Sequence, residues 1–297
     1  MTACVILNPY SARWKARQRW PEAEAALKEA GIDFDFYEMQ GPNDGIRLGE
    51  EVVRKGYSPI IVAGGDGGIS EVVNGMHRAQ PEGVLGPLGV MPMGTANDLA
   101  VNLGLPLDLK QAAKVIAVGK RRRIDLIRAN EWVFDNNSAI GLEPVVTLYN
   151  IRMVRLKGVV RYLVAALRAI YDGPRWEAKL TWDGGSYTGP LSLVSVGNCP
   201  VTGGLFRMAP AADPADGRLT FVYGFAKNRR KMLSLLPRTI NGSFVNDPAI
   251  HQEHATRLEI DVSPVTPIQV DGELRSEALS RVVYEVLPGR LDILKPG

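Results

Sequence analysis

The chain has 297 residues, of which 45% are hydrophobic, and a formal net charge of +3 at pH 7; this length predicts two domains with substantial cores. No run of about eighteen apolar residues is present, which argues against a membrane-spanning helix, and the small net charge gives no support for nucleic acid as a partner. The N-terminus lacks the basic and apolar blocks of a signal peptide, and Cys4 and Cys199 lie in apolar strand-like segments, as core thiols do in a reducing cytoplasm.

Strand-like and helix-like segments alternate over the first 130 residues. Strands are expected at residues 4–8, 34–39, 60–63, 88–91 and 123–129. Helices are expected between them at residues 17–29, 43–55, from 69 onward, 95–102 and 109–118. This alternation predicts an α/β domain over residues 1–130, with a mainly parallel sheet and helices on both faces.

The pattern changes after residue 131. Segments rich in β-branched and aromatic residues are bounded by Gly, Pro and Asp, and they lie at residues 177–182, 191–197, 218–223, 258–262, 268–270 and 282–286. They predict a mainly antiparallel β-sandwich over residues 131–289. Two helical stretches interrupt it, at residues 144–171 and 228–241. Residues 290–294 are expected to return to the first domain as a strand, so residues 290–297 belong with residues 1–130.

A glycine-rich turn follows the apolar strand at residues 60–63. It consists of Gly64, Gly65, Asp66, Gly67 and Gly68, and helical spacing of apolar residues begins at residue 69. Backbone N–H groups in such a turn lie beside the positive end of a helix dipole, which favours phosphate. A carboxylate beside phosphate calls for a divalent metal, a water network or a basic partner. The alternative is an ordinary tight turn between a strand and a helix.

A second polar loop follows the strand at residues 88–91. It contains Gly94, Thr95, Asn97 and Asp98. Thr95 and Asn97 suit the start of a helix, where their side chains cap free N–H groups, and an ordinary cap is the alternative interpretation. Because loops that leave parallel strands at their carboxyl ends line one crevice, we expect this loop to face the glycine-rich turn. Asp98 would then lie near Asp66.

Other charged residues extend this hypothesis. Asp125 follows a basic run and is a candidate third carboxylate. Arg13 and Lys15, in the loop after the first strand, could meet outer phosphates or could simply face solvent. Asp271 and Glu273 flank a glycine in a hairpin-turn signal, and either could instead serve as a base that takes a proton from a substrate hydroxyl.

Taken together, these motifs resemble the diacylglycerol kinase catalytic-domain family. The similarity is closest to its soluble bacterial lipid kinases, and sphingosine and ceramide kinases are more distant. The motifs occur in order along nearly the whole chain: Asn8-Pro9, the GGDGG turn, residues 71–75, residues 92–98, Asp125, and residues 136–141, 203–210, 213–217 and 270–273.

The resemblance implies an ATP-dependent lipid kinase that uses Mg²⁺. Its nucleotide contacts would be Asn8, Gly64, Gly65, Asp66, Gly67, Gly68, Glu71, Gly94, Thr95 and Asn97. Its metal-binding positions would be Asp66, Asp98 and Asp125 at the nucleotide, and Asp213, Asp216 and Arg218 at a second divalent ion held partly through backbone carbonyls. Its catalytic base would be Glu273 or Asp271, with Glu273 the usual assignment.

The chain also departs from the family pattern. Gly68 stands where the family has threonine, and Ala12 stands where glycine usually follows the Asn-Pro-x-Ser run. Met39 or Gln40 replaces a common threonine, and Ala96 a frequent glycine. Several polar nucleotide contacts are therefore absent, although a backbone N–H at Gly68 can still bind phosphate. These departures favour nucleotide binding more strongly than turnover.

Cationic and apolar residues are interleaved at residues 151–171, and a second basic cluster lies at residues 227–231. This pattern fits an interfacial helix on anionic lipid, or a helix packed on the sandwich with its charges in water. The expected partner is a lipid with a free hydroxyl. The expected location is the cytoplasm, with peripheral contact at the inner membrane surface, and a homodimer stays open. An NAD kinase and a non-catalytic nucleotide- or lipid-binding homologue are the alternative functions.

Overall fold

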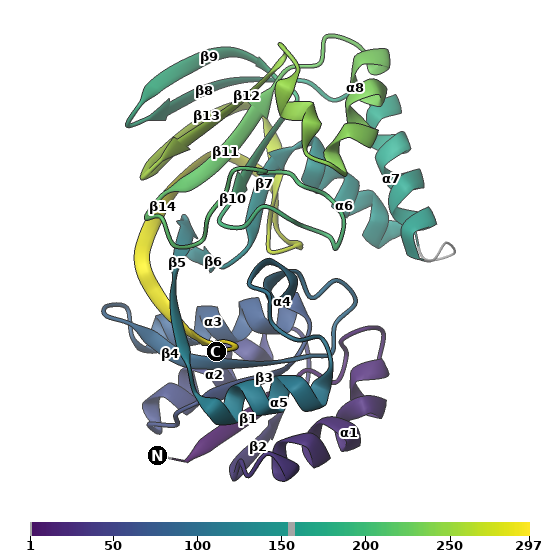
Figure 1. The fold of residues 1–297 in the computed structure, drawn as a ribbon. Coiled ribbons are helices and arrows are strands. Elements are labelled where there is room, and N and C mark those ends of the chain that lie inside the picture. The colour runs from purple at the N-terminus through teal and green to yellow at the C-terminus, as the bar shows by residue number, and fades with distance from the viewer. Residues whose placement is uncertain (1, 154–157) are drawn as a thin grey trace.

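The computed structural model describes residues 2–153 and 158–297. Figure 1 shows an α/β part that contains the N-terminus and a second part in which strands lie on one side and helices on the other. Two long strands connect the parts, β5 (Arg121–Ala129) and β14 (Glu273–Leu294). The last residues of β14 pair with a strand of the first part, so the chain returns to the domain in which it began.

The first domain is built on a parallel sheet. Its strands lie in the order β4, β3, β1, β2, with all pairs parallel. They span β1 (Ala3–Leu7), β2 (Phe34–Glu38), β3 (Ile60–Gly64) and β4 (Leu85–Pro92). The helices are α1 (Lys15–Glu29), α2 (Asp44–Arg54), α3 (Asp66–Ala79), α4 (Asp98–Asn102) and α5 (Leu109–Val118).

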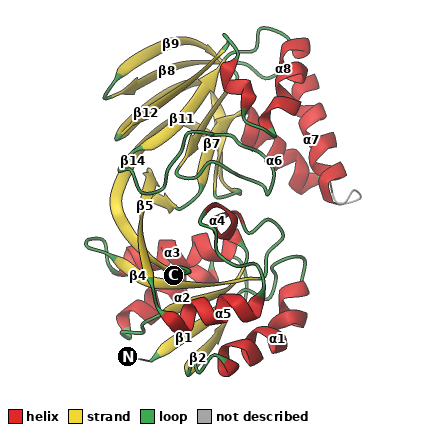
Figure 2. Ribbon diagram, in the orientation of Figure 1, coloured by secondary structure: helices red, strands yellow, loops and turns green. Residues whose placement is uncertain are grey.

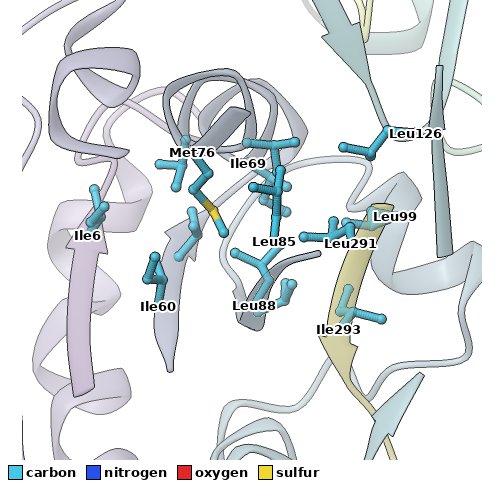
Figure 3. Packing of buried hydrophobic residues seen from close by; sticks show 14 of the residues in the cluster. Ile6, Ile60, Ile69, Met76, Leu85, Leu88, Leu99, Leu126, Leu291 and Ile293 are labelled. Carbon is cyan, nitrogen blue, oxygen red and sulfur yellow. The ribbon is translucent and has the colours of Figure 1, made fainter. Parts of the chain in front are cut away.

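The apolar run of β3 explains why both faces of this sheet are covered. Ile60 and Val62 belong to the core beneath α2, α3 and α4, and Figure 3 shows Ile60 facing Ile69 and Met76. Ile61 belongs to the opposite core, beneath α1 and α5. Successive residues of a strand point to opposite faces, so a strand between two helical layers must be apolar throughout. The predicted parallel sheet with helices on both faces is confirmed.

The second domain is mainly antiparallel. The strands of its central run lie in the order β12, β11, β10, β7, β13, β14. Its strands are β6 (Trp132–Phe134), β7 (Asn137–Gly141), β8 (Trp176–Trp182), β9 (Gly185–Leu191), β10 (Leu193–Gly197), β11 (Leu219–Gly224), β12 (Ile250–Ala255) and β13 (Arg257–Val270). Its helices gather on one side (Figure 2): α6 (Leu142–Arg152), α7 (Gly158–Asp172), α8 (Arg229–Leu235), η1 (Leu236–Thr239) and η2 (Ser243–Asn246).

Several element boundaries differ from the sequence-based expectation. The helix expected from residue 69 begins at Asp66, because glycines of low helix propensity can still form a first turn at the end of a strand. The helix expected at residues 144–171 is two helices, α6 and α7. The two strands expected at residues 258–270 form one strand, β13, because bulges between Asp261 and Thr266 carry the chain past Pro264 without ending the pairing.

Among the described residues, no helix combines the length and the apolar character needed to cross a membrane. Cys4 and Cys199 are buried free thiols, as expected for core cysteines. Burial raises the pKa of both thiols, which makes them poor nucleophiles.

Candidate active site

The loops after β1, β3 and β4 are joined at one edge of the sheet. The Asn8 N–H donates to the carbonyl oxygen of Ala63 (2.9 Å), and the Met93 N–H donates to that of Gly64 (2.7 Å). The Gly65 N–H donates to Ser11 Oγ (3.1 Å). The expected convergence of these loops is therefore confirmed, because hydrogen bonds connect each of them to the end of β3.

Gly65 and Gly94 bring two of these loops into backbone contact. A Cβ on Gly65 would lie 2.8 Å from Gly94 Cα, and a Cβ on Gly94 would lie 2.5 Å from Gly65 Cα. No side chain fits at either position, so the requirement for glycine is steric. Directly beyond this contact begins α3, whose first N–H groups have no intrahelical partner and are suited to an anion.

Asp66 links the starts of two helices. It is the first residue of α3, and its Oδ1 accepts a hydrogen bond from the Leu99 N–H at the start of α4 (3.2 Å). Asp66 therefore performs the capping function predicted for Thr95 and Asn97. Asn97 instead accepts from the Gly94 N–H through Oδ1 (2.8 Å), and Thr95 is exposed. Burial raises the pKa of Asp66, partly offset by backbone N–H donors at α4.

Asp98 holds the two domains together. Its Oδ2 accepts from the Gly203 N–H (2.6 Å) and its Oδ1 from the Gly204 N–H (2.7 Å), both in the loop after β10. Burial, followed by repulsion from Asp66, raises the pKa of Asp98 to about 6. The prediction that Asp98 lies near Asp66 is correct, and its carboxylate serves as an interdomain acceptor.

Asp125 lies apart from this pair and clamps a different loop. Its oxygens accept from the Gly217 N–H (2.7 Å) and the Gly289 N–H (2.6 Å). Gly217 lies in the loop predicted to hold a second divalent ion. In that loop Asp216 accepts from the backbone N–H of Arg218 (2.9 Å), and Asp213 is exposed. No group of three His, Cys, Asp or Glu side chains among the described residues converges as a metal site.

Asp271 is buried at the turn between β13 and β14. Its Oδ1 accepts from the backbone N–H groups of Asn136 (3.1 Å) and Asn137 (3.2 Å), and its Oδ2 from that of Asp135 (3.4 Å). Burial raises the pKa of Asp271 to about 6, against the effect of these donors. Asp135, which no motif marks, is also buried, and its pKa is raised by burial and then by the charge of Asp271.

Glu273 reaches the start of α3 from the second domain. A Cβ on Gly67 would lie 2.9 Å from Glu273 Oε1, so the carboxylate lies directly over the glycine-rich first turn. Unlike Asp271, Glu273 is exposed. Glu71, a predicted nucleotide contact, accepts from the backbone N–H groups of Asn43 (3.0 Å) and Gly45 (2.9 Å) and so holds α2 against α3.

A cavity of about 380 Å³ begins beside these carboxylates and extends into the second domain. At one end it is lined by Asp66, Asp98, Asp271 and Glu273. The rest is largely apolar, and its wall includes Leu142, Val146, Ile170, Met232, Leu235 and Phe244 from the helical side of the domain. The cavity therefore joins a polar, acidic end to a space suited to an aliphatic chain.

Comparison with known proteins agrees with this arrangement. Residues 2–129 match the model of the diacylglycerol kinase catalytic domain, and residues 137–295 match that of the YegS C-terminal NAD kinase beta sandwich-like domain. The chain belongs to the diacylglycerol kinase family. The family resemblance noted in the sequence is thus confirmed.

Relatives of this diacylglycerol kinase family member match along most of their length. The chain is 27% identical to diacylglycerol kinases of Staphylococcus carnosus and Bacillus subtilis, over 91% of this chain and 88% and 89% of theirs. A solved Bacillus anthracis structure described as a diacylglycerol kinase aligns with a TM-score of 0.75 at 21% identity, covering 99% of this chain and 97% of that one. The structural similarity shows that the two proteins share this fold.

Glu143, near the start of α6, is a buried acceptor in this family member that sequence reasoning missed. Its Oε1 accepts from Asn137 Nδ2 (3.0 Å) and from Gln269 Nε2 (3.0 Å). Gln269 Oε1 in turn accepts from the Gly272 N–H (2.8 Å), next to Glu273. Only the tertiary fold assembles this network, because its members come from β7, α6 and the end of β13.

We expect Glu143 to make the free energy of unfolding fall as the pH rises. Burial raises its pKa from 4.5 to about 7, so the folded chain retains a proton that the unfolded chain loses. This contribution is fully present below the unfolded pKa and is lost as the pH rises through the folded value, by about 1 kcal/mol between about pH 6 and pH 8. Urea unfolding should show a weaker pH dependence for Glu143→Gln, which keeps the shape but cannot titrate. The same pH dependence in both proteins would contradict this assignment.

Proposed function

We propose that this protein transfers the γ-phosphate of ATP to a free hydroxyl of a diacylglycerol-like lipid, with Mg²⁺ as cofactor. The observation that carries the proposal is the apolar cavity that ends at Asp271 and Glu273, opposite the glycine-rich start of α3. Such a cavity fits an acyl chain whose hydroxyl end reaches the carboxylates. The names of the bacterial relatives support the same substrate class.

The nucleotide would lie at the edge of the parallel sheet. Because Gly65 and Gly94 have no side chains, phosphate can approach the backbone N–H groups there. The dipole of α3 also favours negative charge at this place. Asn8, the loop at Gly94 and the exposed hydroxyl of Thr95 surround this place. Bound ATP would supply the phosphoryl group, so the role of the chain is to position it and to neutralise charge.

Asp66 is the residue best suited to hold Mg²⁺. It lies at the start of α3, and burial makes its negative charge costly. Asp98 lies close by, because the charge of Asp66 contributes to the raised pKa of Asp98. A divalent cation would relieve both costs. Mg²⁺ is commonly held by one or two carboxylates together with substrate phosphates and water, which fits this pair.

Glu273 would accept the proton of the lipid hydroxyl. It is exposed at the acidic end of the cavity and lies against Gly67, so it can touch both a nucleotide at α3 and a lipid in the cavity. Asp271 would position it, since backbone donors already occupy both of its oxygens. The apolar wall would hold the acyl chain and keep bulk water from the transferred group. The proposed place of action is the cytoplasmic surface of the inner membrane, where such lipids occur.

Incubation with radiolabelled ATP, Mg²⁺ and separate diacylglycerol, sphingoid-base and NAD samples tests this function. Label is expected in the diacylglycerol product, and Asp66→Ala is expected to lower the rate by at least about 100-fold, because positioned electrostatic groups contribute effects of this size. Label in NADP would favour an NAD kinase. ATP binding without any labelled product would favour a non-catalytic homologue. Full activity of Asp66→Ala would contradict the assignment of Asp66 as the residue that holds Mg²⁺.

A further inference from the structure

The position of the Glu273 carboxylate depends on the backbone turn that precedes it. Among the residues that the structure describes, none forms a hydrogen bond or an ion pair with this side chain. The turn itself is unusual, because Asp271 and Gly272 have left-handed φ values of 47° and 78°. A residue other than glycine keeps such a conformation only where its surroundings fix it. The contacts that fix the turn therefore also fix Glu273.

Gln269 holds this turn from the side of the second domain. Its side chain is only 2% exposed. Its Oε1 accepts a hydrogen bond from the Gly272 N–H (2.8 Å), and its Nε2 donates to Glu143 Oε1 (3.0 Å). An amide side chain has one accepting and one donating end, so an acceptor at Glu143 leaves the accepting end of Gln269 for Gly272. Glu143 thus sets the orientation of the amide that holds the turn.

Two further side chains continue this connection to the first domain. Asn137 Nδ2 donates to the same Glu143 oxygen (3.0 Å), and Asn137 Oδ1 accepts from the Thr202 hydroxyl (2.9 Å). Thr202 directly precedes the two glycines whose N–H groups bind Asp98 of the first domain. We call the four side chains the turn network, and they are Thr202, Asn137, Glu143 and Gln269. The turn network forms an unbroken path from the contact between the domains to the turn before Glu273.

We propose that the turn network positions Glu273 relative to the carboxylates at the starts of α3 and α4. The two groups of carboxylates come from different domains, and a misplacement of about 1 Å can lower a rate by about 100-fold. Asp271 binds only backbone N–H groups of its own domain, so it cannot set this distance alone. The effect on catalysis rests on the proposed function of Glu273, whereas the effect on the turn does not.

Thr202→Val tests the proposal at the end of the network farthest along the path from Glu273. The change removes the hydroxyl and keeps the shape, and kcat should fall by about 10-fold while the KM for ATP stays the same. Thr202→Ser keeps the hydroxyl and should recover most of the activity. Thr220→Val is the matched control, because that hydroxyl bonds to His254 Nδ1 (2.9 Å) outside the network, and kcat should not change.

The kinetic constants also distinguish positioning from contact with the lipid. Thr202 lines the cavity, so it could in principle touch the substrate. A higher KM for diacylglycerol with an unchanged kcat would show such a contact and would overturn the proposal.

A double-mutant cycle with Glu273→Gln distinguishes positioning from a general structural role. If Thr202 acts through Glu273, then Thr202→Val should not lower the rate further once the base is absent. The same 10-fold loss in both backgrounds would show that Thr202 acts in another way, and the proposal would be wrong.

Hydrogen exchange of the Gly272 amide gives a measurement that needs no kinase activity. Exchange followed by NMR should become about 10-fold faster in Gln269→Leu, which removes the acceptor, and about 3-fold faster in Thr202→Val. Thr220→Val should leave it unchanged. Unchanged exchange in Thr202→Val would overturn the proposal even in an active kinase. Faster exchange in a protein that phosphorylates no lipid would keep the network as the support of the turn and reject the proposed function.

Discussion

Glu273→Gln is expected to lower kcat by about 10² to 10⁴-fold, the usual contribution of a positioned base. The change keeps the shape of the side chain and removes its ability to accept the proton of a lipid hydroxyl. The KM for ATP should change less than kcat, because Glu273 comes from the second domain and glutamine preserves the shape of the side chain beside Gly67. Initial rates with labelled ATP and diacylglycerol give both constants. Since Glu273 is exposed, the free energy of unfolding should stay within about 0.5 kcal/mol of the wild type.

Asp271→Ala supplies the contrasting control. Three backbone N–H groups, those of residues 135–137, lose their acceptor in this variant. Buried donors without partners cost about 1 to 3 kcal/mol each, so the main effect should be on stability, and urea unfolding measures it. If Glu273→Gln were fully active while Asp271→Asn was stable but inactive, Asp271 would be the base and Glu273 the positioning residue.

Local signals predicted the first domain well. The buried run of β3 is apolar on both faces and is bounded by glycine, and the spacing of apolar residues in α5 gave its limits, Leu109–Val118. These signals act over a few residues and need no knowledge of the rest of the chain. The joining of the loops after β1, β3 and β4 followed from one further step, because the carboxyl ends of parallel strands meet at one edge.

The partners of the site carboxylates could not be predicted in the same way. Asp98 binds backbone N–H groups at Gly203 and Gly204, and Asp125 binds those of Gly217 and Gly289. Each pair joins segments far apart in the sequence, and no local pattern marks a glycine N–H as a partner. The same reason explains why Asp135 and Glu143 were missed, since their unusual pKa values arise from burial.

Gly68 illustrates how the structure changes the meaning of a sequence difference. The family pattern has threonine here, so the glycine appeared as a lost phosphate contact. In the structure Gly68 is buried in the first turn of α3, and a Cβ there would lie 3.0 Å from Asn8 Nδ2 and 3.1 Å from Asn8 Cβ. The Asn8 side chain thus packs against the place where a threonine would begin. A larger residue at position 68 would require Asn8 to shift, so the two positions are coupled.

Gly65→Ala should disrupt the nucleotide site without any backbone strain of its own. The φ of Gly65 is −109° and its ψ is −176°, an extended conformation that alanine adopts freely. The new Cβ would nevertheless lie 2.8 Å from Gly94 Cα, and a backbone atom cannot move aside as a side chain can. The two loops must separate, at a cost of about 1 to 3 kcal/mol in the free energy of unfolding, and ATP affinity should fall with them. Gly41→Ala is the matched control, because its Cβ would have no neighbour within 4 Å. Urea unfolding and calorimetric titration with ATP should distinguish the two variants. Equal stability and equal ATP affinity in both would show that ATP binding does not depend on the close approach of these two loops.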